Sequence, residues 1–263
     1  MTVFVINMAR STARLKRVAA RLAELGVKWE RLDAVDDSQL DETARIRAFS
    51  RLGWWCCTLA PIVRGQLGCA MSHQRAQRAM IERGLDVACV LEDDVVLGDQ
   101  FPEALAWAEK QVDASRAQVA LFGDHESTPH NNDDALADFS LKRASWAWGA
   151  EGYALTRRAA EAMLADNSPI RVMNDTWGRW VDQGTIELFR VQPAVCAQTS
   201  WDNPGESEIA RSMQAADLPP VGRAWWTVRR AFGVALDAIS SPRRLRGRLV
   251  QLLRRMRIAG EGA

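Results

Sequence analysis

The chain has 263 residues, of which 48% are hydrophobic and 25% charged, and its formal net charge is +1. This length suits one large α/β domain, or one domain with a short appendage. The hydrophobic core of such a domain is stable without disulfides or structural metal ions. No stretch reaches the roughly 18 apolar residues of a membrane-spanning helix, and the N-terminus lacks the basic start of a signal peptide. We therefore expect a protein that neither crosses a membrane nor is exported by a conventional signal.

Cysteine usage points to a reducing, cytoplasmic compartment. The five cysteines are odd in number and form neither a CxxC pair nor a zinc pattern. Most lie in apolar segments, where cysteine usually serves as a small core residue. For the adjacent pair Cys56 and Cys57, a structural role is favoured over oxidation.

The amino-terminal part begins with a strand, a helix and a second strand, which indicates a sheet covered by helices. Residues 3–6 are β-branched or aromatic, residues 11–25 carry apolar side chains at helical spacing, and residues 29–35 have the pattern of the second strand. Residues 38–64 predict no regular element. Ligand sites in such folds lie at the carboxyl ends of the strands.

A helix over residues 65–83 leads to the continuously apolar run 87–91, which is typical of a strand buried on both faces. Glu92, Asp93 and Asp94 follow at its carboxyl end, and residues 95–97 continue beyond. Residues 124–138 are polar and rich in turn formers, which predicts a surface loop. The remaining elements are predicted as helices at 102–112, 157–165 and 175–182 and as strands at 118–122, 146–155 and 186–191.

These elements predict one domain over residues 1–212, a Rossmann-like mixed sheet flanked by helices. From residue 219 to residue 263 the character changes, because tryptophans and other apolar residues alternate with many arginines. This pattern predicts a pair of basic amphipathic helices. Attachment to an anionic membrane surface is the favoured interpretation. Packing on the domain or on a second protomer stays open, and nucleic-acid binding is not expected.

Three consecutive acids after a buried strand are costly unless they are neutralised, because like charges at close range raise each other's pKa. A divalent cation with oxygen ligands would neutralise them. Alternate residues of an extended segment project to the same side. Glu92 and Asp94 are therefore predicted as metal ligands, and Asp93 is left to bind the backbone or a sugar hydroxyl. The alternative is an acidic turn that caps the next element.

Five short motifs occur in a fixed order over roughly residues 1–210. Together they resemble glycosyltransferase family 25, which contains lipooligosaccharide galactosyltransferases and related collagen galactosyltransferases. The motifs are Val5-Ile6-Asn7-Met8-x-Arg10-x-x-x-Arg14, Asp33-Ala34-Val35-Asp36-Asp37, Gly65-Gln66-Leu67-Gly68-Cys69-Ala70-Met71-Ser72-His73, Val90-Leu91-Glu92-Asp93-Asp94-Val95, and Gly149-Ala150-x-Gly152-Tyr153-Ala154-Leu155-Thr156-Arg157-x-Ala159-Ala160.

The resemblance implies a GT-A-type fold, an inverting transfer from a UDP-sugar, most often UDP-galactose, and Mn²⁺ or Mg²⁺ as cofactor. Gln66 stands where the family more often has Glu, and Ala150 where it usually has Thr, which leaves the donor sugar open. We expect a cytoplasmic, membrane-peripheral enzyme that adds a hexose to a lipooligosaccharide- or lipopolysaccharide-type acceptor, either a glycan or a lipid-linked glycan.

Two other classes of protein remain alternatives. One is a non-catalytic scaffold with a sugar-nucleotide fold, docked at the membrane. The other is a sugar-phosphate nucleotidyltransferase. That class usually carries a glycine-rich loop after its first strand, and no such loop follows Ile6.

Inverting transfer needs a base that takes a proton from the acceptor hydroxyl. The resemblance implies Asp175, which follows Pro169 and Ile170 as in the family, as base or acceptor-binding residue. A helix N-cap is the alternative role for Asp175. Glu151 is a rival base, because residues 146–151 superficially resemble an acceptor motif of other galactosyltransferases.

Donor-binding candidates lie at the strand ends and in the motifs. Asn7 and Asp33 are candidates for the uridine and ribose, Arg10 and Arg14 for the diphosphate, and His73 for a phosphate or the metal. For these side chains, ordinary structural roles or solvated helix charges are the alternative. His125 and His130 in the predicted loop are further candidates for a metal ligand or for closing over the donor.

Overall fold

The computed structural model describes residues 1–58, 62–63, 65–123 and 139–198. They form a seven-stranded sheet in the order β2-β1-β3-β7-β5-β8-β6. β1, β2, β3, β5 and β8 run in one direction, whereas β7 and β6 run in the other. The predicted mixed sheet is therefore confirmed. The bounds are Thr2–Asn7 (β1), Glu30–Asp33 (β2), Val87–Glu92 (β3), Gln118–Leu121 (β5), Ser140–Ala144 (β6), Gly152–Thr156 (β7) and Glu187–Gln192 (β8).

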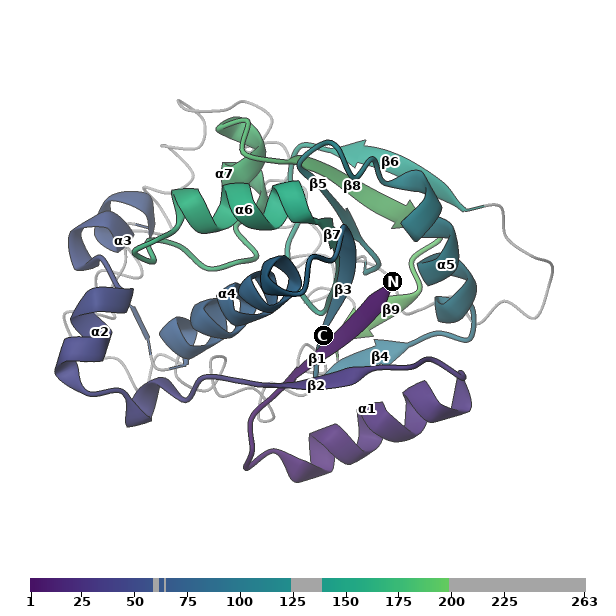
Figure 1. Cartoon of the computed structure of the whole chain (residues 1–263), viewed down its shortest axis with the longest axis horizontal. Helices are drawn as coiled ribbons and strands as arrows, with labels where there is room; N and C mark the ends of the chain where they lie inside the picture. The colour runs from purple at the N-terminus through teal and green to yellow at the C-terminus, as the bar shows by residue number, and fades with distance from the viewer. Residues whose placement is uncertain (59–61, 64, 124–138, 199–263) are drawn as a thin grey trace, which may run out of the picture.

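Helices cover both faces of this sheet (Figure 1). Phe4 and Ile6 of β1 face a core shared with α4, α6 and α7. Val3 and Val5 of the same strand face a second core, shared with α1 and α5. Side chains alternate along a strand, so β1 contributes to both cores and must be apolar throughout. The helices are α1 (Thr12–Glu24), α4 (Gln66–Glu82), α5 (Phe101–Gln111), α6 (Arg157–Asp166) and α7 (Trp177–Asp182).

Two short helices, α2 (Glu42–Ala48) and α3 (Arg51–Thr58), and the 3-10 turn η1 (Asp37–Gln39) occupy the segment for which no element was predicted. Trp54 anchors this segment, because its side chain is buried against Leu67 of α4 and Ile170. Cys56 and Cys57 are exposed on α3 and form no disulfide. Their exposure differs from the buried setting expected for most of the cysteines, whereas Cys89 and Cys196 are buried as expected.

The predicted elements after β3 need two corrections. Residues 95–97 leave the main sheet, because β4 (Val95–Leu97) pairs antiparallel with β9 (Cys196–Gln198) in a separate two-stranded sheet. The strand predicted over 146–155 begins only at Gly152. Before it, the rings of Trp146 and Trp148 pack edge to face, with their centroids 5.4 Å apart.

Within the described ranges, no helix is long and apolar enough to cross a membrane. The predicted loop 124–138, with His125 and His130, lies outside the described residues, and so does the basic segment 219–263.

Candidate functional site

The acidic cluster lies where β3 leaves the sheet. Glu92 is the last residue of β3, and Asp93 and Asp94 form the turn that leads into β4. Asp93 and Asp94 are only 6% and 3% exposed, and Glu92 is half-buried. The backbone N–H of Glu92 donates to the carbonyl of Glu151 at 2.9 Å, which fixes the end of the strand against the segment before β7. The predicted position of the acids at a strand's carboxyl end is confirmed.

Arg14 of α1 is the cation nearest to these acids. One of its guanidinium nitrogens lies 3.0 Å from Asp93 Oδ1 and 2.6 Å from Asp94 Oδ2. Asn7, at the end of β1, donates a hydrogen bond of 2.7 Å to Asp93 Oδ2. Asp93 is thus bound by side chains of two other elements, not by the backbone. The protein itself supplies part of the positive charge that the sequence argument assigned to a metal.

Glu92 and Asp94 share a hydrogen-bond donor, although Asp93 and Asp94 form a turn, not the extended segment that was predicted, and Asp93 does not face away from Asp94, since Arg14 contacts both. The side-chain amide of Gln198, in β9, donates to Glu92 Oε2 and to Asp94 Oδ2, each at 3.2 Å. An amide N–H₂ that serves two carboxylates occupies the place where a cation would be bound by both. The two side chains therefore offer a pair of oxygen ligands for a hard cation.

A chain of hydrogen bonds supports the other oxygen of Glu92. His73 Nε2 lies 3.0 Å from Glu92 Oε1, and His73 Nδ1 lies 2.9 Å from the hydroxyl of Tyr153. Asn174 donates to the same hydroxyl at 3.4 Å and accepts from Gln77 at 3.1 Å. The Tyr153 hydroxyl accepts from Asn174 and can therefore donate to His73 Nδ1. In the neutral imidazole the proton is then on Nε2, where it points to Glu92.

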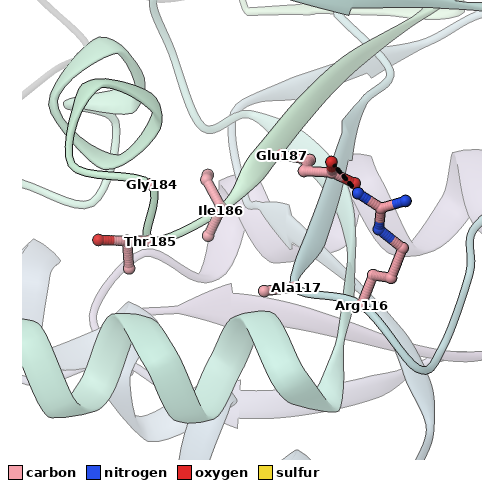
Figure 2. A pocket seen from close by; sticks show the side chains of 6 residues that line it. All are labelled: Arg116, Ala117, Gly184, Thr185, Ile186 and Glu187. Carbon is pink, nitrogen blue, oxygen red and sulfur yellow. Dashed lines mark hydrogen bonds and ion pairs between the residues drawn. The ribbon is translucent and has the colours of Figure 1, made fainter.

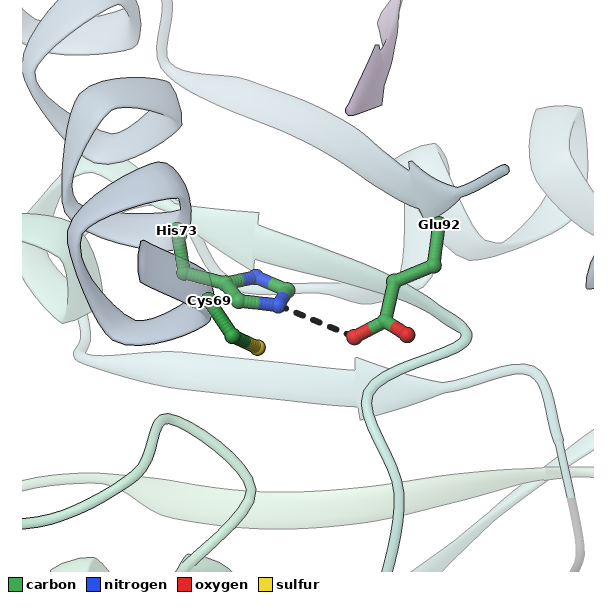
Figure 3. Close-up of side chains that lie close together, drawn as sticks. All are labelled: Cys69, His73 and Glu92. Carbon is green, nitrogen blue, oxygen red and sulfur yellow. Dashed lines mark hydrogen bonds and ion pairs between the residues drawn. The ribbon is translucent and has the colours of Figure 1, made fainter. Parts of the chain in front are cut away.

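Cys69 lies beside this contact. Cys69 and His73 are four residues apart on α4, so both side chains project from one face of the helix. The Cys69 sulfur, a His73 ring nitrogen and a Glu92 carboxylate oxygen all lie within 4.8 Å of one another. Figure 3 shows the three side chains pointing toward a shared space, with the His73–Glu92 contact drawn.

Burial dominates the proton affinities of this region. It raises the pKa of Asp94 to about 7, with Glu92 and Asp93 adding to the effect and Arg14 opposing it. Burial likewise raises the pKa of Asp93, against the influence of Arg14 and Asn7. The Cys69 thiol has its pKa raised by burial and then by the surrounding carboxylates, Glu92 first. The cluster thus holds more negative charge than its own cations balance.

The two candidate bases differ in accessibility. Burial, followed by Glu92, raises the pKa of Asp175 to about 6, and this side chain is half-buried. Burial raises the pKa of Glu151 to about 8, and the residue is only 4% exposed. Glu151 Oε1 packs against Gly123, because a Cβ atom built on Gly123 would lie only 2.0 Å from this oxygen. Glu151 Oε2 is buried and has no hydrogen-bond partner among the described residues. At neutral pH Glu151 is thus a neutral acid enclosed by backbone.

Two predicted donor-binding residues lie apart from the acids. Arg10 pairs with Asp36 in the loop after β2. Asp33 is an exposed side chain that pairs with Arg31 at 2.8 Å. Arg31 also donates to Asn7 at 3.2 Å, and Asp33 is itself the register partner of Asn7 in the β1–β2 pair, so Asn7 links Asp33 to the acids.

The glycine-containing motif before His73 positions α4 against the loop after β2. A Cβ on Gly68 would lie 2.4 Å from the carbonyl oxygen of Val35, so only glycine permits this approach. The Val35 N–H donates to Ser72 at 2.8 Å, and the Gly65 N–H donates to Asp37 at 3.2 Å. These contacts fix the rotation of α4, which directs His73 toward Glu92.

A hollow of about 330 Å³ lies at the opposite end of the sheet (Figure 2). It is formed where β5 and β8 begin, and the ion pair of Arg116 with Glu187 lines it. Because β3, β5 and β8 are parallel in direction, this hollow is far from the carboxyl end of β3. It contains none of the predicted site residues.

The sequence did not single out several residues of the site. Gln198 comes from a strand whose partner lies far away in sequence, and no local pattern marks it. Tyr153 stands in a family-like motif, but no role was assigned to it. Cys69 was detectable, because it stands four positions before His73 in a predicted helix. Tyr153 is also the chain's single tyrosine, and it is fully buried beside Trp177, with 5.3 Å between ring centroids.

The sequence model of glycosyltransferase family 25, described as LPS biosynthesis protein, matches residues 1–177. This range contains every motif described above and the whole acidic cluster. The chain belongs to glycosyltransferase family 25.

Individual relatives are similar at low identity. The lacto-N-neotetraose biosynthesis glycosyltransferase LgtB of Neisseria meningitidis is 24% identical over 210 residues, which cover 74% of each chain. Human procollagen galactosyltransferase 2 is 24% identical over 172 residues, 63% of this chain and 27% of the relative. The human inactive glycosyltransferase 25 family member 3 is 28% identical over 65% of this chain and 29% of its own length. The chain thus spans under a third of these human relatives.

Among solved structures, a candidate glucose-1-phosphate thymidylyltransferase from Bacillus anthracis aligns with 84% of this chain and 75% of its own, at 11% identity and a TM-score of 0.35. A likeness this weak carries no conclusion about fold or function.

Proposed function

We propose that this chain is an inverting glycosyltransferase that moves a hexose, with galactose as first candidate, from a UDP-sugar to a lipooligosaccharide- or lipopolysaccharide-type glycan. Family membership supports the reaction class, and the name of the neisserial relative supports the acceptor class. The observation that carries the proposal is the acidic cluster at the end of β3, bound by Arg14, Asn7 and His73. All of these residues belong to the family-like motifs.

Glu92 and Asp94 are the proposed ligands of Mn²⁺ or Mg²⁺. Their oxygens meet at the amide of Gln198, and carboxylate oxygens are the ligands that these cations prefer. Burial chiefly raises the pKa of Asp94, and the nearby Glu92 adds to the effect; a cation at this position would favour the ionised carboxylate. A cation bound here would stabilise the charge that develops on the departing nucleoside diphosphate.

Arg14 is the proposed diphosphate-binding residue. It now bridges Asp93 and Asp94, and a cation at Asp94 would release its guanidinium for phosphate oxygens, which it binds well because of its planar fork of donors. Asn7, Asp33 and Asp93 are the proposed contacts to the nucleoside and sugar hydroxyls. Arg10, which pairs with Asp36, remains a proposed second contact to the diphosphate, farther from the acids.

Asp175 is the proposed base. Its pKa of about 6, raised chiefly by burial, leaves it ionised at neutral pH yet basic enough to accept a proton from the acceptor hydroxyl. The competing candidate, Glu151, has a pKa of about 8 because of burial, and its carboxyl group is packed against Gly123. The lower pKa and greater exposure of Asp175 therefore favour it over Glu151 as the base.

The acceptor and the membrane belong to the same proposal. The tryptophans and arginines of residues 219–263 suit the headgroup layer of an anionic bilayer. Attachment there would bring the site to a lipid-linked glycan. The proposed location is the inner face of the cytoplasmic membrane, with no nucleic acid as partner.

A donor screen tests the proposal. The full chain is incubated with each common UDP-sugar and a lipooligosaccharide acceptor, and UDP release is measured with Mn²⁺, with Mg²⁺ and with EDTA. We expect release with one donor, abolished by EDTA. Asp94→Asn should lower kcat by about 100-fold or more. The matched control is Asp99→Asn, an exposed acid paired with Arg21, which should retain activity. UDP release by no donor would refute the proposal.

A non-catalytic scaffold is the second candidate, because one human relative is described as inactive. It predicts that UDP-sugars bind without turnover. Calorimetric titration with UDP, run beside the turnover assay, separates the two candidates. Binding with no release of UDP would favour the scaffold.

A further inference from the structure

We propose that Cys69, His73 and Glu92 form a binding site for a borderline divalent cation of the Zn²⁺ class, which shares Glu92 with the Glu92–Asp94 pair but has two ligands of its own. The three potential ligand atoms, a sulfur, a nitrogen and an oxygen, lie within 4.8 Å of one another (Figure 3). A tetrahedral Zn²⁺ with bonds of about 2.0–2.3 Å places its ligands roughly 3.5 Å apart. Side-chain movements of about an ångström would therefore complete the site.

Helix geometry brings two of the ligands together. Cys69 and His73 stand at positions i and i+4 of α4, the spacing at which paired helical ligands hold a metal. Gly68 and Ser72 fix α4 against the loop after β2, so the backbone of these ligands is already in place. Glu92 comes from a strand end on the opposite side of the shared space.

The residues behind the ligands resemble the outer shell of a metal site. A metal-binding histidine almost always has its second ring nitrogen hydrogen-bonded, which orients the ring. His73 meets this condition, because Nδ1 lies 2.9 Å from the Tyr153 hydroxyl, which Asn174 contacts in turn. The hydroxyl can accept as well as donate. The His73 proton can therefore move to Nδ1, which leaves Nε2 free for a cation.

Glu92 can serve this site without losing its other contacts. Its Oε1 faces His73, whereas its Oε2 accepts from Gln198 beside Asp94. The Glu92 carboxylate thus directs one oxygen toward Cys69 and His73 and the other toward Asp94. The sulfur and the imidazole select Zn²⁺ or Co²⁺ over Mg²⁺, whereas the carboxylate pair favours hard cations. The two sites therefore differ in the metal that they take.

The electrostatic surroundings favour a cation at this position. Glu92, Asp175 and Asp94 all act on Cys69 as negative charges. Binding would release the Cys69 thiol proton to solvent and join the thiolate to the metal. Three protein ligands leave a fourth position open, the arrangement of zinc sites that admit water or a substrate.

Cobalt spectroscopy tests the site directly and does not depend on transferase activity. The full chain, stripped with EDTA, is titrated with Co²⁺ while the near-ultraviolet charge-transfer band of a cobalt thiolate is recorded. We expect the band to saturate at a single Co²⁺ per chain and to vanish when Zn²⁺ is added. Cys69→Ser should lose the band, and Tyr153→Phe should weaken Co²⁺ affinity by about tenfold or more.

Two control variants separate this site from others. Cys56 and Cys57 are exposed thiols on α3, and the double variant Cys56→Ser/Cys57→Ser should keep the band. Asp94→Asn should also keep it, because Asp94 is not one of the three ligands of this site. No band in the parent chain, or an equal band in Cys69→Ser, would overturn the proposal.

A second measurement uses the unaltered chain, in case Cys69→Ser fails to fold. Alkylation by a small thiol reagent is mapped by mass spectrometry with and without Zn²⁺. We expect Zn²⁺ to protect Cys69 while the exposed Cys56 and Cys57 are alkylated in both conditions. Equal alkylation of Cys69 with and without Zn²⁺ counts against the site.

Discussion

Tyr153 shows how much of the site depends on a single buried hydroxyl. Its oxygen connects His73, on α4, with Asn174, in the segment before α7. No other tyrosine occurs in the chain. The ring also packs against Trp177, and phenylalanine would preserve that contact. The hydroxyl and the ring can therefore be tested separately.

We predict that Tyr153→Phe lowers the free energy of unfolding by about 1–3 kcal/mol, because it leaves buried polar groups of His73 and Asn174 without a partner. Urea unfolding of the metal-free chain at pH 7 measures the change. The control is the back-substitution to Tyr153, which should restore the stability of the parent chain. A loss below about 0.5 kcal/mol would mean that water or a rearranged amide replaces the hydroxyl.

The buried carboxyl group of Glu151 makes the stability of the chain depend on pH. Burial raises its pKa from 4.5 to about 8 in the folded chain, so the folded state binds more protons than the unfolded state between these values. Stability must then fall as pH rises from about 4.5 to about 8. Glu151→Gln removes this contribution. The variant should be more stable than the parent at pH 8, by on the order of a few kcal/mol, and nearly equal to it at pH 4.

Unfolding in urea with EDTA present, across this pH range, measures the difference. Burial also raises the pKa of Asp94 to about 7, so the free energy of unfolding of the Glu151→Gln variant should still depend partly on pH. Parallel pH profiles for Glu151→Gln and the parent would show that Glu151 is already neutralised by a partner.

At the scale of elements, α4 is the piece that connects the loop after β2 with the acids. Its apolar side packs on the sheet, and Gly68 permits the close approach to Val35. Glycine inside a helix normally costs about 1 kcal/mol relative to alanine. The steric benefit at Gly68 must exceed this cost.

We predict that Gly68→Ala destabilises the chain by about 1–3 kcal/mol, because the added methyl group would overlap the Val35 carbonyl, which is backbone and yields little. Helix propensity alone predicts the opposite sign. Thermal or urea unfolding decides between the two. Glu82→Ala, at an exposed position of the same helix, should change stability by less than about 0.5 kcal/mol. A stabilised Gly68→Ala variant would contradict the steric argument.

Helical spacing of apolar residues identified the longer helices, and two strands were identified by their uniformly apolar composition. β1 and β3 are buried on both faces, so their composition alone identifies them. β6 was missed because it is an edge strand with mostly exposed or half-buried side chains, Ser-Leu-Lys-Arg-Ala. β9 was missed because it has only three residues. Its existence depends on β4, which lies a hundred residues earlier in the chain.

The site also contains features that the local sequence predicts and features that depend on tertiary packing. The position of Glu92, Asp93 and Asp94 followed from the apolar run before them, a local property. Their partners did not follow, because Arg14, Asn7 and Gln198 reach them through the packing of three separate elements. A single sequence contains no local signal for that packing. The sequence argument therefore left out Arg14, which pairs with Asp93 and Asp94.

At the scale of the whole molecule, the composition of residues 219–263 allows membrane attachment to be tested against the other interpretations. It contains a run of arginines around residues 243–248. Each cationic side chain near an anionic bilayer contributes about 1 kcal/mol to binding. The contribution is screened by salt.

We predict that replacing Arg243, Arg244, Arg246 and Arg248 by glutamine weakens binding of the full chain to phosphatidylserine-containing vesicles by at least about tenfold at physiological salt. Vesicle co-sedimentation measures it. The control replaces Arg116 and Arg143, exposed residues of the described domain, and should bind as the parent does. Unchanged binding by the tail variant would refute attachment through these arginines.

The contact between Asp94 and Gln198 spans 104 positions of the chain. At a ribosomal speed of about 5–20 residues per second, the acids are made about 5–20 s before this last partner exists. Arg14, by contrast, has been synthesised before them. During that interval the nascent chain can neutralise its acids with Arg14, and the oxygen pair opposite Gln198 acquires its final geometry only when β9 joins β4.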